Sequence, residues 1–315
     1  MPGVLPTQKM EHGLNSAGAF RRLRRFALAA GALALCFAVP LWNLICFAAT
    51  SEFHSYILLI PFISAYLVWT KWRTLPLDSW PARLIGGILL AAGMMVILAY
   101  WLLFRSHWNL VEDDYLALMM FAFLLCFLGV CCLFWGRDTL CAAVFPLGLL
   151  IFMVPIPTFA MPSIDSFLQN GSATAAQCFF SLSGTPFLRD GMVFQLPGIS
   201  IQVAPECSGI QSSLVLLITG LMAGYLFLRT PWKRALFIVF MVPLGLLRNG
   251  FRVFTIGELC VHIGPQMINS PIHRKGGPIF FVLSLIPLFI LLIVLQRSEK
   301  GGGKGNLKTS KTNHA

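Results

Sequence analysis

Three residues that together support acyl transfer occur in the second half of the chain: Cys207, Arg252 and His273. A thiol beside the start of a helix is biased toward thiolate, its nucleophilic form, by the helix dipole and the unpaired backbone amides. A histidine can take the thiol proton and later protonate a leaving amine, and an arginine can stabilise a tetrahedral oxyanion. These residues therefore permit cysteine-based catalysis, provided that the fold brings them together.

The local sequence around Cys207 predicts a helix start, and two starts fit. Pro205 can be the first helical residue, or Ser208 can be the N-cap with Gln211 completing a capping box. Both place the thiol at or beside the first helical turn. Gly209, which has no side chain, leaves the approach to the sulfur open.

Arg248, Asn249 and Arg252 lie toward the end of a later apolar segment. Residues four apart share a helix face and differ by about 6 Å in height, so both arginines are expected to point one way at two depths. An arginine inside a membrane is a functional candidate because it costs several kcal/mol unless it is paired or hydrated. The alternative for Arg252 is that its side chain snorkels to the interface. Arg248 and Asn249 are expected to support Arg252.

The composition predicts a membrane protein. Of 315 residues, 57% are hydrophobic and 11% are charged, which is too apolar for a soluble globular surface. The formal net charge of +11 comes from short basic clusters beside apolar segments, so it indicates membrane orientation and not nucleic-acid binding. The first apolar segment is followed by many more, so we expect a retained span and no cleaved signal peptide.

The hydropathy pattern predicts an all-α polytopic membrane protein with about eight transmembrane helices and a short β-hairpin on the outer face. The Lys/Arg clusters put both chain ends in the cytoplasm, with His273 to Lys275 as the exception on the outer side. Residues 1–25 then form a cytoplasmic segment, 26–296 the transmembrane domain, and 297–315 a disordered cytoplasmic tail. The expected spans are 26–47, 56–69, 84–104, 115–135, 140–154, 210–228, 235–256 and 278–295.

A long outer segment, residues 155–206, precedes Cys207. Within it, Met161 to Ser183 is typical of an interfacial amphipathic helix, although Gly171 interrupts the pattern. Residues 192–196 and 199–203 flank Pro197 and Gly198, which suit a type II turn, so we expect a hairpin that leads to Cys207. The topology then puts Cys207, Arg252 and His273 on one side of the membrane at similar height.

The nine cysteines show no CxxC pair and no zinc-type spacing with histidine, so we expect no metal and no cofactor. Most lie inside apolar runs, where a thiol packs as a small hydrophobic group. Only Cys178, Cys207 and Cys260 could face the outer aqueous side.

Three motifs resemble the exosortase and archaeosortase family: the run APECSGIQS at residues 204–212, NGFRV at 249–253, and His273 followed by Gly277 and Phe281. Their order and membrane context agree with the family over most of the chain. The resemblance implies a multi-span cysteine peptidase or transpeptidase, thought to act like sortases by convergence, with Cys207, Arg252 and His273 as catalytic residues. Gln211 departs from the arginine that many exosortases have there, which leaves the subfamily and its sorting signal open.

The resemblance also implies the substrates: exported proteins that end in a short Pro-Glu-Pro-like motif, one transmembrane helix and a basic tail. A substrate helix beside the last spans would hold its motif at the height of Cys207. The expected location is the cytoplasmic membrane of a prokaryote, with the site facing outward. Two rival hypotheses remain: a transporter or flippase in which Arg248 and Arg252 bind an anionic polymer or lipid, and a non-catalytic scaffold for exopolysaccharide export.

Overall fold

The structure is a computed structural model that describes residues 7–51, 54–72, 82–105, 111–203, 209–270 and 276–309. Of the described residues, 83% are helical. It divides into two compact units, residues 1–159 and residues 160–315, and each unit is described by itself.

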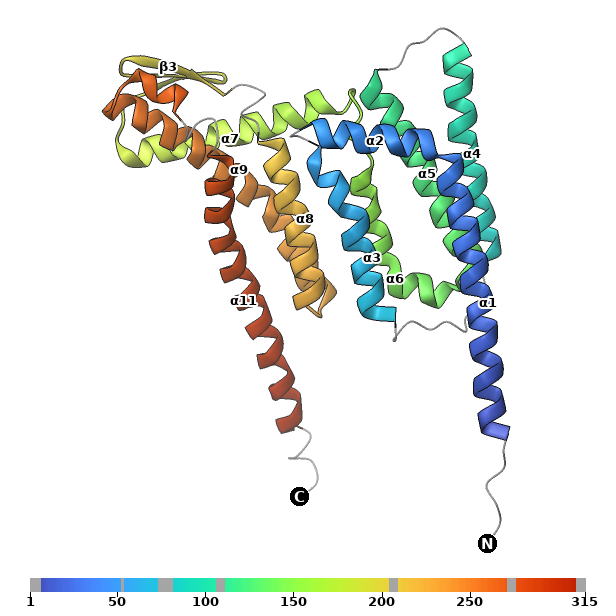
Figure 1. The fold of residues 1–315 in the computed structure, drawn as a ribbon. Helices are drawn as coiled ribbons and strands as arrows, with labels where there is room; N and C mark the ends of the chain where they lie inside the picture. Colours follow the sequence, from blue (N-terminus) through green and yellow to red (C-terminus); the bar gives the residue numbers. More distant parts are fainter. Residues whose placement is uncertain are drawn as a thin grey trace. The chain divides into compact units, whose positions relative to one another are not determined.

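The regular elements described in unit 1 are all helices (Figure 1). Its elements are α1 (Thr7–Cys36), α2 (Ala38–Thr50), the 3-10 helix η1 (Ser55–Leu59), α3 (Ile60–Lys71), α4 (Arg83–Arg105), α5 (Glu112–Phe134), α6 (Arg137–Leu149) and the 3-10 helix η3 (Leu150–Met153).

Unit 2 combines helices with one small sheet. Its elements are α7 (Met161–Ser183), β1 (Leu188–Asp190), β2 (Val193–Leu196), β3 (Ile199–Gln202), α8 (Ile210–Phe227), α9 (Pro231–His262), the 3-10 helix η5 (Pro265–Asn269) and α11 (Gly277–Thr309).

Five of the described helices are long and apolar enough to cross a membrane: α4, α5, α8, α9 and the first part of α11. A sixth span results if residues 21–36 of α1 are counted together with α2, although the two are bent by 71°. The count of eight spans is therefore not confirmed. The expected first span, 26–47, is wrong as a continuous helix, because the ring of Pro40 would clash with the carbonyl of Cys36 in an unbroken helix. Residues 55–71 form a shorter apolar helix.

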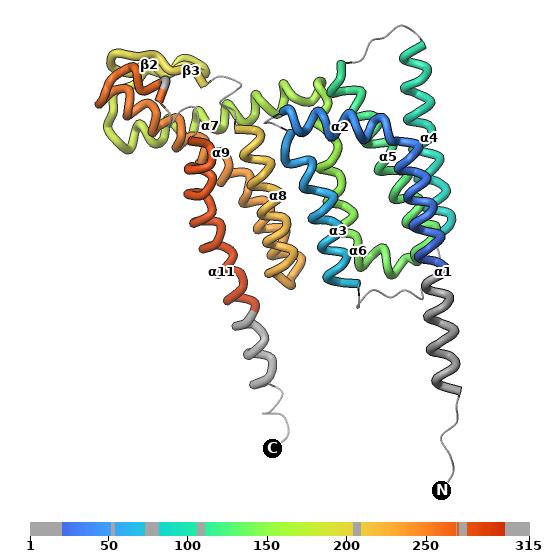
Figure 2. Tube along the Cα trace, in the orientation of Figure 1, coloured from blue at the N-terminus to red at the C-terminus, as the bar shows by residue number. Residues whose placement is uncertain are grey.

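In unit 2, α8, α9 and α11 lie side by side, and α7 crosses them at one end (Figure 2). The predicted helix from Met161 to Ser183 is confirmed with the same bounds. Gly171 does not interrupt this helix. A Cβ at Gly171 would lie 2.7 Å from a methyl group of Leu246, so the glycine lets α9 approach α7 closely. Of the face predicted on α7, Ala175 is buried and Phe167 is exposed.

The predicted hairpin is present and belongs to a three-stranded antiparallel sheet of order β1-β2-β3. Gly198 has a φ of 81°, which matches the third position of a type II turn after Pro197. The sheet packs on α7 and on the last third of α9, and we call this assembly the cap (Figure 1). Its core includes Phe180, Phe194, Leu196, Ile201, Val203, Val253, Ile256 and Cys260.

The length of α9 explains how one helix serves both the membrane and the cap. It has 32 residues, or about 48 Å, whereas a hydrocarbon core of about 30 Å takes up about 20 residues. If the basic turn at Lys233 lies at one interface, Arg252 falls near the opposite interface, nineteen residues later. The cap core then begins at Val253, just outside the hydrocarbon.

Helix α11 extends to Thr309. Near residue 297 it contacts the turn between α8 and α9. The Glu299 carboxylate accepts hydrogen bonds from the backbone amides of Arg229, at 3.1 Å, and Thr230, at 2.8 Å. Gln296 also donates to the carbonyl of Phe227 at 3.2 Å. The division of the chain into a domain and two cytoplasmic ends stays a prediction.

Small residues set the distance between α7 and α9, and Gly250→Ala tests this. An added Cβ at Gly250 would lie 2.5 Å from the Ala175 Cβ and 2.9 Å from the Ala176 amide nitrogen, so backbone atoms would have to move. We expect destabilisation of about 1–3 kcal/mol. The measurement is the thermal transition of the purified protein in detergent.

The matched control for that substitution is Gly87→Ala, since the same added methyl meets nothing within 4 Å in α4. Helix propensity alone favours alanine there by up to about 1 kcal/mol. An unchanged transition in Gly250→Ala would contradict close packing of α7 against α9.

Candidate active site

The candidate site centres on one turn of α9, from Arg248 to Arg252. Arg248 and Asn249 are buried, with 7% and 3% of their surfaces exposed, and Arg252 is half-buried. The two arginines therefore lie at different depths, as the sequence predicts. Each residue of this turn has a distinct set of neighbours.

Arg248 fastens α9 to the first turn of α8. Its guanidinium donates to the Ser212 carbonyl at 2.9 Å, to the Ser212 hydroxyl at 2.7 Å and to the Ser213 hydroxyl at 3.2 Å. Buried in a membrane protein, a guanidinium is stable only with such partners. Arg248 therefore holds the first turn of α8 against α9.

Asn249 connects three helices of unit 2. Its Nδ2 donates to the Ser172 hydroxyl of α7 at 3.0 Å, in a buried bond. On its other side it lies against Gly209, where an added Cβ would come within 3.0 Å of the Asn249 Oδ1 atom. The residue that precedes α8 is therefore held against the middle of this α9 turn.

Helix α8 begins at Ile210 with Gly209 as its N-cap. The two predicted helix starts, Pro205 and Ser208, lie outside the described residues. Gly209 has a φ of 72°, in the left-handed region that favours glycine, and this conformation separates the helix from the preceding chain. Its carbonyl accepts the Ser213 amide at 2.8 Å and the Ser212 hydroxyl at 3.1 Å. Asn249 occupies the space beside Gly209, and the approach to the Cys207 sulfur lies outside the described residues.

Cys207, Ser208 and His273 lie outside the described residues. The chain is described on both sides of each. Val203, buried in the cap, donates its amide to the Met192 carbonyl at 2.9 Å, and Gly209 resumes the chain against Asn249. Ser270 and Gly276, both buried, flank the stretch that contains His273.

An aromatic cluster surrounds the α9 turn beside Arg252, and the sequence analysis missed it. The Phe251 ring contacts Phe179 of α7 at 5.5 Å, Phe254 at 6.1 Å and Phe280 of α11 at 6.1 Å between centroids. The spacing of Phe251 and Phe254, three residues apart on one helix face, was a usable signal. Through Phe280, the start of α11 lies at the height of Arg252.

A second polar cluster, also missed, joins the end of α7 to α9 within the cap. The Glu258 carboxylate accepts the Thr185 hydroxyl at 2.5 Å and the Ser183 hydroxyl at 3.1 Å, and it contacts the ring of His262 at 3.0 Å. Glu258 thereby links the end of α7 to α9, about two turns beyond Arg252. Among the described residues, no group of three or more His, Cys, Asp or Glu side chains is placed so that it could hold a metal ion.

Comparison with known families gives one result. Residues 42–290 match the family described as transmembrane exosortase, which is 249 of the 315 residues. The chain therefore belongs to the transmembrane exosortase family. Neither the curated proteins nor the solved structures contain a match.

Gly209→Ala tests the contact between the start of α8 and Asn249. The new methyl group meets both a left-handed φ and the Asn249 side chain, so we expect a loss of stability of about 2–4 kcal/mol. Gly198→Ala is the control, because it shares a positive φ but has open space around the added atom, and it should cost only about 1–2 kcal/mol.

The measurement is the thermal transition of each variant in detergent. Equal losses of stability in the two variants would contradict the packing of Gly209 on Asn249. Adding Asn249→Ala should recover part of the loss in Gly209→Ala and none of the loss in Gly198→Ala.

Proposed function

We propose that this protein is a membrane-embedded cysteine peptidase or transpeptidase that cleaves C-terminal sorting signals of exported proteins. Cys207 is the nucleophile, His273 the general acid and base, and Arg252 the group that stabilises the oxyanion. Arg248, Asn249, Gly209 and Ser208 are supporting residues.

The observation that carries this proposal is that the flanks of both reactive residues are attached to the turn of α9 that bears Arg252. Gly209 contacts Asn249, and chain length keeps Cys207 within about 7 Å of Gly209 between Cα atoms. Phe280, in the first turn of α11, packs on Phe251. His273, three residues before Gly276, is within about 11 Å of it by the same limit.

In the proposed reaction, His273 takes the thiol proton and the Cys207 sulfur attacks the scissile carbonyl carbon. The tetrahedral oxyanion forms beside the Arg252 guanidinium, whose planar fork suits a charged oxygen. Collapse of this intermediate expels the amine, which leaves with the proton from His273, and a thioester remains on Cys207. An acceptor nucleophile, or water, then attacks the thioester and restores the thiol.

Family membership and the three long apolar helices of unit 2 support this substrate class. A protein with a short motif, one transmembrane helix and a basic tail can lie along α8, α9 and α11, which places its motif near Arg252. Binding in the plane of the membrane supplies proximity without a deep soluble cleft. The positive-inside rule then favours a site on the outer face of a cytoplasmic membrane, since Arg229, Lys233 and Arg234 lie at the opposite end.

Cys207→Ala should leave the protein folded in the membrane and abolish processing of a co-expressed substrate that carries the sorting signal. The readout is the fraction of substrate that has lost its C-terminal helix. Cys178→Ala is the control, because Cys178 is an exposed thiol on α7. Normal processing by Cys207→Ala would exclude it as the nucleophile.

Arg252→Lys should lower kcat by about 100-fold or more with little change in KM, because lysine keeps the charge but lacks the planar fork. Arg189→Lys is the control for arginine loss in the cap, where Arg189 donates to Gln177 at 2.7 Å. Full activity in Arg252→Lys would show that a positive charge is sufficient and would contradict directed oxyanion recognition by the guanidinium.

A further inference from the structure

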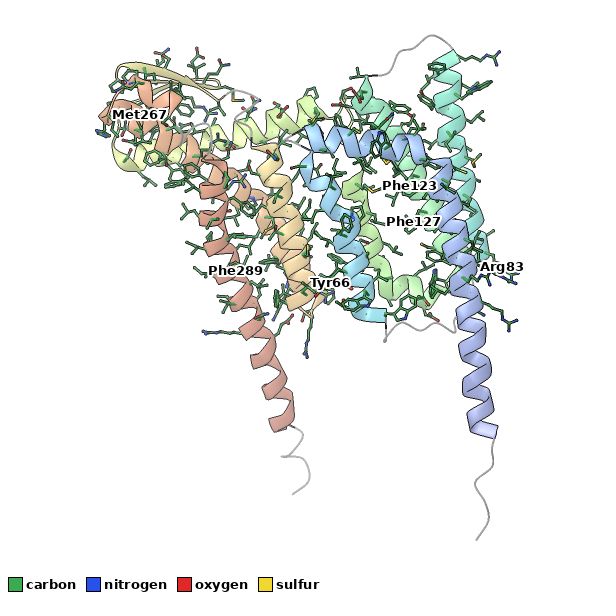
Figure 3. The ribbon with its side chains drawn as sticks, in the orientation of Figure 1. Tyr66, Arg83, Phe123, Phe127, Met267 and Phe289 are labelled. Atoms are coloured by element: carbon green, nitrogen blue, oxygen red, sulfur yellow. The ribbon has the colours of Figure 1, made fainter. Side chains whose placement is uncertain are left out.

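Unit 1 contains a cavity of about 480 Å³ among α1, α3, α5, α6 and η3. Its walls are almost entirely apolar, with the rings of Phe26 and Phe127 among them, and Figure 3 shows Phe127 on α5. Ser64 and Thr139 supply the only hydroxyl groups of the lining. The Ser64 hydroxyl already donates to the Pro146 carbonyl at 2.7 Å. The cavity therefore suits a hydrocarbon ligand.

The dimensions of the cavity match one membrane leaflet. Its wall on α5 extends from Phe123 to Trp135, about 18 Å of helix, and one leaflet is about half of a 30 Å hydrocarbon core. Its apolar lining suits the acyl chain of a lipid.

One end of the cavity has a cationic rim. Exposed Arg22, Lys71 and Arg137 come from α1, α3 and α6. Each lies one helical turn from a cavity-lining residue of its own helix, on the same face: Phe26, Val68 and Leu140. Among the described side chains of unit 1, Asp138 is the one acidic group at this end.

An aromatic cluster marks the level at which the rim meets the cavity. The Trp135 ring contacts Trp72 at 5.6 Å and Phe26 at 5.4 Å between centroids. Tryptophan concentrates at the boundary between hydrocarbon and headgroups. The apolar cavity thus lies on the hydrocarbon side of this boundary, and the cationic rim lies on the headgroup side.

We infer that this cavity is a binding site for an anionic phospholipid of the leaflet on the basic side of the membrane. An acyl chain fills the cavity, and the phosphate lies among Arg22, Lys71 and Arg137. Basic pockets between transmembrane helices bind anionic headgroups in this way. The positive-inside rule assigns this leaflet to the cytoplasm.

The test uses the full chain in mild detergent, incubated with equal amounts of phosphatidylglycerol and phosphatidylcholine that carry the same acyl chains. Native mass spectrometry counts the lipids that each chain retains. The wild type should retain one phosphatidylglycerol in preference to phosphatidylcholine. The double variant Arg22→Gln/Arg137→Gln should lower this preference about 30-fold, since each basic residue contributes about fivefold.

A second pair of variants tests the cavity itself. Ala65→Phe places a ring in the cavity and should abolish retention of both lipids, whereas Ala91→Phe, at an exposed position of α4, should retain them as the wild type does. If Ala65→Phe melts below the wild type, Ala143→Leu replaces it as a smaller filling substitution. The inference would be overturned if the wild type retained the two lipids equally, or if filling the cavity left retention unchanged. A dimer without bound lipid would also overturn it, because a second copy of the chain would then cover the cavity.

Discussion

The candidate site depends on the contact of Asn249 with α7 on one side and with the start of α8 on the other. Its side chain donates to Ser172 and lies against Gly209, and Arg248, the preceding residue, donates to Ser212. Polar groups buried at membrane depth must find partners, so these bonds constrain the helices more than apolar packing alone would. The chain that contains Cys207 thereby starts and ends at fixed points.

The cap gives this arrangement a rigid support outside the hydrocarbon. Because α9 is longer than the membrane is thick, its last turns provide the core on which α7 and the sheet pack. Gly250 and Gly171 allow close approach of α7 and α9, and Glu258 fixes the end of α7. Arg252 lies where the apolar part of α9 meets the cap.

Local sequence rules predicted those features that local physics decides. The bounds of α7 and the turn at Gly198 follow from periodicity and from the turn preferences of proline and glycine. Gly209 precedes α8 in a left-handed conformation and lies against Asn249, a contact between residues distant in sequence that local rules do not predict. The contact of Glu299 with Thr230 is likewise distant in sequence. Cys207 and His273 came from motifs, and their convergence with Arg252 remains a prediction.

That convergence is tested most directly by disulfide cross-linking between Cys207 and a cysteine introduced at position 273. Bridged cysteines need Cα atoms within about 7 Å, so His273→Cys should cross-link readily to Cys207 under mild oxidation. Ile263→Cys, in the same connection but about 16 Å beyond Arg252 along α9, should not. Efficient bridging at 263, or none at 273, would contradict a shared site.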